Sequence, residues 1–416
     1  MTANDPTSGL PVDEVLARLE GLRANDVAWR DGRAFSLAYV ADDDTMALAA
    51  EAYRRFAGEN ALNTDAFPSL RRMQGDVVGI VSGWLGAPEG AAGAFTSGGT
   101  ESILLVVKAA RDQFAAARGV ARPNAVLPAS AHAAFNKACH YFGVEARRMP
   151  VRDDWRADPD AMAAACDDNT VLVVASAPQY PQGVVDDVPA IAALAARIGA
   201  NCHVDACMGG VTLHFLALLG EPVPTWNFDV PGVTSVSVDL HKFGYASKGA
   251  GVVVYRTKEL RGWQHYVTDD WLGGLYGSSG LLGTKSGGPI AAAWAVLHHL
   301  GDEGYLRLTG AARRATLAIA AGIEATPRLV LRARPDATLL AVGAADPESL
   351  DVFAVADELR QRGWYIDRQG PPPSLHLTVN AVHETKVDEF VADLRTAVKT
   401  VGASRGDAGE YGKIDL

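Results

Sequence analysis

From about residue 94 onward, the chain alternates short apolar segments of strand length with amphipathic segments of helix length. The expected strands cover 124–127, 145–149, 171–176, 201–204, 234–238 and 251–255, and the expected helices cover 101–117, 133–142, 159–167 and 188–198. Strands that alternate with helices in this way form βαβ units. The sequence therefore predicts an α/β fold with a mostly parallel sheet and helices on both of its faces.

The same pattern divides the chain into five parts. We expect an N-terminal helical segment over 1–58, a large α/β domain over 59–290, a connecting helix over 291–327, a small C-terminal α+β domain over 328–403 and a polar tail over 404–416. A length of 416 residues suits two or three domains at the usual size of about 100–200 residues.

Composition argues against several classes of protein. The formal net charge is −11 and no basic cluster stands out, which argues against a nucleic-acid partner. Cys139, Cys166, Cys202 and Cys207 lack metal-site spacing and suit reduced thiols. No segment reaches the ~18 apolar residues of a membrane span, and the first ten residues do not resemble a signal peptide. We therefore expect a cytoplasmic protein with no metal site and no membrane span.

Lys242 follows His241 at the end of an apolar segment, and glycines come close behind. This arrangement is typical of a lysine that carries pyridoxal phosphate (PLP) as a Schiff base. The lysine amine attacks the aldehyde carbon only when it is neutral, so we expect a partly desolvated, cation-rich pocket around it. The feature indicates an enzyme whose cofactor supplies most of the chemistry.

Two further features suit a PLP site. The turn SGGT precedes the expected helix 101–117, and backbone N–H groups at Gly99 and Thr100 could bind a phosphate there. Asp205 follows a strand and could pair with a pyridinium nitrogen. Each has a plainer interpretation: the turn could be a helix cap, and the aspartate could be structural.

His132 and a glycine-rich loop are weaker candidates. His132 precedes a helix and could stack on a cofactor ring, or it could be a capping residue. Gly283, Thr284 and Lys285 could hold an anion through backbone N–H groups and an ammonium, or could belong to a flexible surface loop. The order of turn, histidine, strand-end aspartate and His-Lys along the chain favours a PLP enzyme over separate coincidences.

Six segments resemble the sphingosine-1-phosphate lyase family, a group II decarboxylase-like branch of the fold-type I PLP enzymes. They are FTSGGTESILLVVKAARD, SAHAAFNKACHYFG, APQYPQGVVDDV, HVDACMGG, VPGVTSVSVDLHKFGYASKGAGVVVYR and DDWLGGLYGSS. The resemblance extends from about residue 60 to 398. It implies the fold-type I transferase-like architecture and PLP as the cofactor.

The resemblance also implies residue roles. Lys242 would carry the cofactor, Asp205 would hold the pyridine nitrogen and His132 would stack on the ring. The residues implied at the cofactor phosphate are Gly99, Thr100 and His241, joined by Gly283 and Thr284 from the partner subunit of a homodimer with shared active sites. Lys248 and Tyr245 would lie near the substrate and assist proton transfers.

The implied reaction is PLP-dependent carbon–carbon cleavage of a phosphorylated long-chain base such as sphingosine 1-phosphate, which gives a fatty aldehyde and phosphoethanolamine. The implied form is the soluble bacterial type without a membrane anchor. Gln182 stands where many members have histidine, and Lys285 and Ser286 stand where arginine and proline are common. These departures concern the substrate more than the cofactor. An amino-acid decarboxylase, an aldolase for a polar β-hydroxy amine and a non-catalytic PLP-fold binding protein therefore stay open as alternatives.

Overall fold

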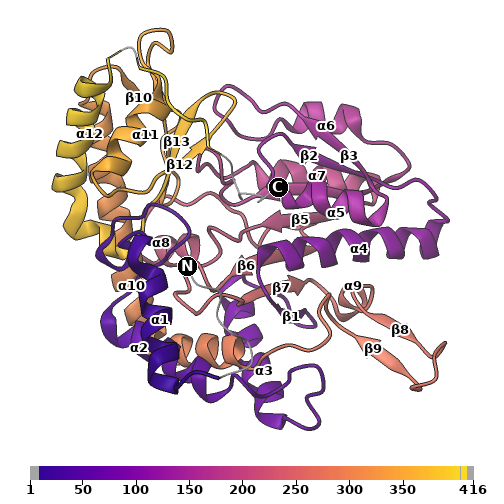
Figure 1. Ribbon diagram of the computed structural model, residues 1–416. Coiled ribbons are helices and arrows are strands. Elements are labelled where there is room, and N and C mark those ends of the chain that lie inside the picture. Colours follow the sequence, from indigo (N-terminus) through magenta and orange to yellow (C-terminus); the bar gives the residue numbers. More distant parts are fainter. Residues whose placement is uncertain (1–8, 403, 410–416) are drawn as a thin grey trace.

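A computed structural model describes residues 9–402 and 404–409, and a seven-stranded sheet forms its centre (Figure 1). The strands are β1 (Ala92–Thr96), β2 (Asn124–Pro128), β3 (Glu145–Met149), β4 (Thr170–Ser176), β5 (Asn201–Asp205), β6 (Ser235–Asp239) and β7 (Gly251–Tyr255). Their order is β1-β7-β6-β5-β4-β2-β3, and β7 runs antiparallel to both of its neighbours while the other pairings are parallel. The predicted α/β fold with a mostly parallel sheet is confirmed.

Helices cover both faces of this sheet. They are α4 (Gly99–Arg118), α5 (Ala134–Phe142), α6 (Pro159–Ala165), α7 (Val188–Ile198), α8 (Thr212–Leu218) and α9 (Lys258–Gly262). In β4, Val173 and Ala175 share one core with α7, whereas Leu172 and Val174 share another with α4. All residues of β4 are buried, as expected for a strand between two helical layers. This double burial explains why the strands read as continuous apolar segments.

A second sheet lies beyond the long helix α10 (Gly288–Glu324), which is kinked at Gly301. Its strands are β10 (Leu329–Leu331), β11 (Leu339–Ala344), β12 (Asp367–Gln369) and β13 (Ser374–Thr378), all antiparallel, in the order β10-β11-β13-β12. Two helices, α11 (Val352–Gln361) and α12 (Val387–Val401), pack with it. The 3₁₀ helix η3 (Ala381–Lys386) leads directly into α12. The division into five parts stays a prediction.

A segment from the N-terminal region and the C-terminal end of the described chain both pack on the elements around this second sheet. Phe35, from the N-terminal region, stacks on His383 and contacts Phe390, with ring centroids 4.3 and 4.5 Å apart. At the other end, Gly406 donates its N–H to Asp351 Oδ2 at 3.0 Å. Residues 404–409 of the predicted tail are therefore tied to the small sheet, whereas 403 and 410–416 lie outside the described residues.

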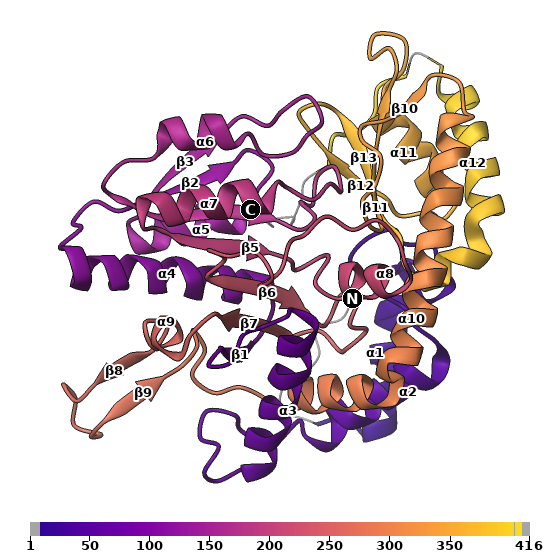
Figure 2. The ribbon, with the colours of Figure 1, turned by 180° about the vertical axis from the view of Figure 1, so that it is seen from behind.

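The remaining elements are at the N-terminus and in a projecting hairpin. They are α1 (Val12–Leu22), η1 (Arg23–Asn25), η2 (Trp29–Asp31), α2 (Asp43–Arg55), α3 (Pro68–Trp84), β8 (Tyr266–Thr268) and β9 (Tyr276–Ser278). The β8–β9 hairpin extends away from the sheets (Figure 2), and the sequence did not predict it. None of the described helices combines the length and apolar character that crossing a bilayer requires.

Candidate active site

A cavity of about 240 Å³ lies where strands β1, β4, β5 and β6 end and helix α4 begins. Ligands of open α/β sheets bind at this carboxyl edge. Six predicted site residues line the cavity, namely Gly99, Thr100, His132, Asp205, His241 and Lys242. They come from four separate places in the sequence, and the sheet brings them together.

Two glycines form a close-fitting turn between β1 and α4. Gly98 has a φ of 137°, and a Cβ there would lie 2.5 Å from His241 Cε1. A Cβ on Gly99 would lie 2.7 Å from Cys207 Sγ and 3.0 Å from Asp239 Oδ2. Glycine is therefore required by the packing, and it exposes backbone N–H groups at a helix N-terminus, where a phosphate binds well.

Filling this turn should weaken cofactor binding. In Gly99→Ala, the added methyl group clashes with Cys207 and Asp239, so we expect the dissociation constant for PLP to rise at least about tenfold, which is about 1.4 kcal/mol. Cofactor absorbance during titration measures this constant. The control is Gly75→Ala in α3, where a Cβ meets nothing within 4 Å. Unchanged affinity in Gly99→Ala would show that the turn does not hold the phosphate.

Asp205 and His132 have protonation states that suit a pyridine ring. Burial alone would raise the pKa of the Asp205 carboxyl, but the electrostatic interaction with His132 and a side-chain hydrogen bond with Cys207 bring that pKa below its ordinary value. Oδ1 also accepts the N–H of Cys207 at 3.1 Å. Burial lowers the pKa of His132, whose Nδ1 accepts the N–H of Ala134 at 3.1 Å. Asp205 is therefore an ionised carboxylate and His132 a neutral imidazole with its proton on Nε2.

Lys242 lies in surroundings that the sequence did not predict. Its Nζ is 2.9 Å from Asp239 Oδ2. Burial lowers the pKa of Lys242, but the Asp239 carboxylate outweighs this effect and the net shift is upward. The expected cation-rich pocket is wrong, because Glu101, Asp205 and Asp239 all line the cavity with it.

Asp239 is the site residue that sequence reasoning missed. It ends β6 as Asp205 ends the neighbouring β5, so the same strand-end signal was available. Its side chain is 3% exposed, and Oδ1 has no hydrogen-bond partner among the described residues. Buried polar atoms are rarely left without a partner, so this oxygen is available to a group bound in the cavity.

Lys248 and Tyr245 do not line this cavity. With His241 they line an adjoining pocket of about 580 Å³, so His241 stands in the wall between the two spaces. Lys248 Nζ donates to the His241 carbonyl at 3.1 Å and lies 4.9 Å from the centre of the Tyr39 ring. Desolvation, and then the charge of Lys242, lower the pKa of Lys248 to about 8, although part of this side chain stays exposed. Burial raises the pKa of Tyr245, so its hydroxyl keeps its proton and can donate a hydrogen bond.

Gly283 and Thr284 lie away from the cavity of their own chain. Thr284 Oγ1 accepts a hydrogen bond from Asn60 Nδ2 at 3.4 Å, and neighbouring Lys285 lines a different pocket. Their contribution to the site of a second subunit stays a prediction.

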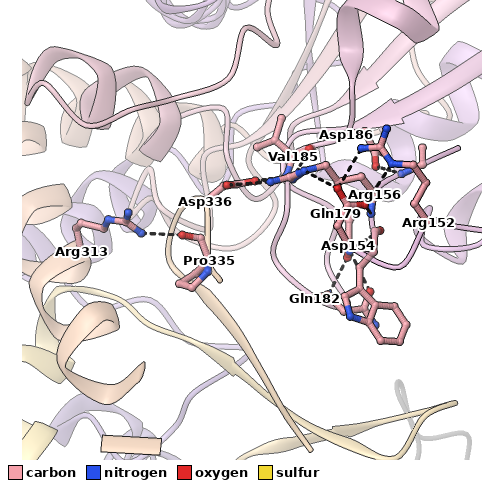
Figure 3. A network of polar contacts seen from close by, with 12 residues as sticks. Arg152, Asp154, Arg156, Gln179, Gln182, Val185, Asp186, Arg313, Pro335 and Asp336 are labelled. Atoms are coloured by element: carbon pink, nitrogen blue, oxygen red, sulfur yellow. Dashed lines mark hydrogen bonds and ion pairs between the residues drawn. The ribbon is translucent and has the colours of Figure 1, made fainter. Parts of the chain in front are cut away.

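The departure at Gln182 has a structural explanation. Gln182 is buried, and it exchanges two hydrogen bonds with Gln179, at 2.7 and 2.9 Å. Figure 3 shows the pair in a polar network in which Arg156 also binds Asp336. Gln182 does not line the cavity. Its side chain therefore stabilises the turn after β4 and does not contact a ligand in the cavity.

Comparison with known proteins identifies the family. The pyridoxal-dependent decarboxylase conserved domain matches residues 8–342. Sphingosine-1-phosphate lyase of Oryza sativa subsp. japonica is 38% identical over 96% of this chain and 75% of its own length. The chain belongs to the sphingosine-1-phosphate lyase family. A solved sphingosine-1-phosphate lyase from Burkholderia pseudomallei is also 38% identical, with a TM-score of 0.90 over 95% of this chain and 92% of that one.

Membership in this family makes the chain a PLP-dependent lyase, and it confirms the predicted cofactor. The cavity fits PLP on its own geometry. It offers a glycine turn at a helix N-terminus for the phosphate, an ionised carboxylate for the ring nitrogen, an imidazole and a lysine. A probable L-aspartate decarboxylase of Pyrococcus abyssi is also similar, at 31% identity over 95% of this chain and 99% of its own length.

Proposed function

We propose that this lyase cleaves sphingosine 1-phosphate, or a closely similar phosphorylated long-chain base, into a fatty aldehyde and phosphoethanolamine. The observation that carries the proposal is the assembly of Lys242, Asp205, His132 and the glycine turn in one cavity. Two relatives that are each 38% identical are named sphingosine-1-phosphate lyases, which supports this substrate.

The pocket beside the cavity supports a substrate with an apolar part. It is lined largely by apolar side chains, among them Leu37, Tyr39, Met46 and Ala49. Its volume of about 580 Å³ leaves room for an alkyl chain. A polar β-hydroxy amine would leave such a surface uncovered, which makes an aldolase for polar substrates the weaker alternative.

Each residue has a proposed task. When bound, PLP withdraws the electron pair that the broken carbon–carbon bond leaves on the substrate. Gly99, Thr100 and His241 would bind its phosphate, and Asp205 would hold a proton on its ring nitrogen. His132 would exclude water from the ring. Lys242 would hold the cofactor and exchange protons at the carbon next to the substrate amine.

Lys248 is the proposed base for the substrate β-hydroxyl, because the lowered pKa near 8 makes its amine neutral in part of the molecules at physiological pH. The neutral form accepts the hydroxyl proton, and this transfer lets the carbon–carbon bond break to an aldehyde. Tyr245, whose pKa is raised, supports the pocket as a hydrogen-bond donor.

This role predicts a pH dependence. Since only neutral Lys248 accepts a proton, kcat/KM should rise as the pH increases through about 8. Lys248→Arg keeps the charge but stays protonated, so we expect a loss of about 10²-fold and no rise near pH 8. Steady-state assays from pH 6 to about 10 measure both, with the exposed Lys258→Arg as the control. An unchanged profile in Lys248→Arg would assign the base elsewhere.

We also propose a cytoplasmic homodimer in which Gly283 and Thr284 of one subunit complete the phosphate site of the other. The hairpin region exposes several large apolar side chains, which supports the proposal that a second protein subunit covers it. They include Tyr266, Trp271, Leu272 and Leu275. The five-part division of the chain is likewise a proposal, supported by the separate cores around the two sheets.

A product assay tests the function. The PLP-loaded protein is incubated with sphingosine 1-phosphate, and the fatty aldehyde and phosphoethanolamine are quantified together. Equal amounts of both support the lyase. Release of CO₂ from L-aspartate, without aldehyde from the lipid, would favour the decarboxylase reaction that the Pyrococcus relative suggests.

A further inference from the structure

Glu101 joins two segments that are far apart in the sequence. It is the third residue of α4 and is 6% exposed. Its Oε2 accepts the N–H of Ser97, in the glycine turn, at 2.6 Å, and its Oε1 accepts the N–H of Leu281 at 2.9 Å. Leu281 belongs to a segment that we call the arm, residues 263–285, which contains the β8–β9 hairpin.

Helix capping explains only one of these two contacts. A glutamate at the third helical position commonly reaches back to a backbone N–H at the start of the helix, which is what Oε2 does at Ser97. The bond from Oε1 to Leu281 adds nothing to the cap, because it goes to a different segment. The approach is close, since a Cβ on Gly280 would lie 2.8 Å from Oε1. A Cβ at residue 280 would therefore displace either this carboxylate oxygen or the arm.

The same helix also holds the other end of the arm. Lys108, two turns after Glu101, donates to the carbonyls of Trp263 and His265 at 2.9 and 2.6 Å. Within the arm, Ser278 Oγ donates to the Gly280 carbonyl at 3.0 Å. Helix α4 therefore carries the glycine turn at its N-terminus and contacts the arm at two points, through Glu101 and Lys108.

We propose that Glu101 is a positioning residue that couples the cofactor site to the arm. When PLP is bound to the glycine turn, the position of Ser97 is fixed. The hydrogen bond from Ser97 then orients the Glu101 carboxylate, and the carboxylate in turn holds Leu281. Coupling between two sites is reciprocal, so the arm contact must in turn strengthen PLP binding. The inference requires PLP binding and not the proposed substrate, so a failed product assay leaves it standing.

The two sides of the link can be broken separately. Glu101→Gln keeps the size of the side chain but places an NH₂ group against one of the two N–H donors. Gly280→Ala pushes the arm away from Oε1, although Gly280 does not line the cofactor cavity. We expect each variant to raise the dissociation constant for PLP about tenfold. We also expect faster hydrogen exchange of the arm in both PLP-loaded variants than in the PLP-loaded parent.

Two controls match these variants. Gly277→Ala lies in the same arm, in β9, where a Cβ meets nothing within 4 Å. Glu89→Gln changes an exposed carboxylate. Both should bind PLP as the parent does. Parent-like PLP affinity in folded Gly280→Ala, together with weak binding in Glu101→Gln, would reduce Glu101 to a helix cap and overturn the coupling. Parent-like affinity in Glu101→Gln would overturn it outright.

Discussion

Replacing Lys242 with alanine should abolish turnover together with the visible absorbance of the lysine-bound cofactor. Without the amine there is no covalent attachment and no group to exchange protons at the reacting carbon. The change also leaves buried Asp239 without its ion-pair partner at 2.9 Å, so the fold must be checked. Absorbance spectra of the purified variant measure cofactor attachment, product assays measure turnover, and circular dichroism checks the fold.

The exposed Lys258→Ala is the matched control and should keep both the absorbance and the activity of the parent. If Lys242→Ala keeps the absorbance band, another lysine carries the cofactor. Lys248 would be the first to test, because it lies near enough for its pKa to be lowered by the charge of Lys242.

Replacing Asp205 with asparagine should lower kcat about 10³-fold, as expected for loss of a preorganised charge that acts on the reacting group. The amide keeps the shape and can still accept the Cys207 N–H, but it cannot hold a proton on the ring nitrogen. PLP should still attach to Lys242, so the cofactor absorbance persists while turnover falls.

Exposed Asp168→Asn serves as the control for Asp205→Asn and should behave as the parent. Activity of Asp205→Asn within about threefold of the parent would mean that the ring nitrogen is not protonated during the reaction. It would then point to another way of stabilising the electron pair, and His132 is the cavity residue to replace next.

The large sheet could be predicted because both of its faces are buried. The resulting apolar segments, such as Thr170–Ser176, are unmistakable in the sequence, and amphipathic helices separate them. The β8–β9 hairpin could not, because its strands have three residues each and lack a buried face. Strand β1 was missed as well, since only two of its five residues are buried.

Site residues could be predicted where they lie directly at the end of a strand or the start of a helix. Asp205, Gly99 and Lys242 are of this kind, because strand ends and helix starts meet at one edge of the sheet. The ion pair between Lys242 and Asp239 depends on how the chain turns after β6, and no residue pattern states that geometry. The position of Lys248 in the lining of the adjoining pocket depends on the same turn and could not be predicted either.

The antiparallel strand β7 has a consequence for how the protein is made. Strand β1, at residues 92–96, lies at the sheet edge, and among the described strands it pairs only with β7, at residues 251–255. Gly251 also packs directly on the glycine turn, where its Cβ would be 2.7 Å from Gly98 Cα. A ribosome must therefore release more than half of the chain before the first strand has its neighbour. Until then the nascent protein cannot bind its cofactor. Its apolar strands stay exposed and can aggregate with those of another chain.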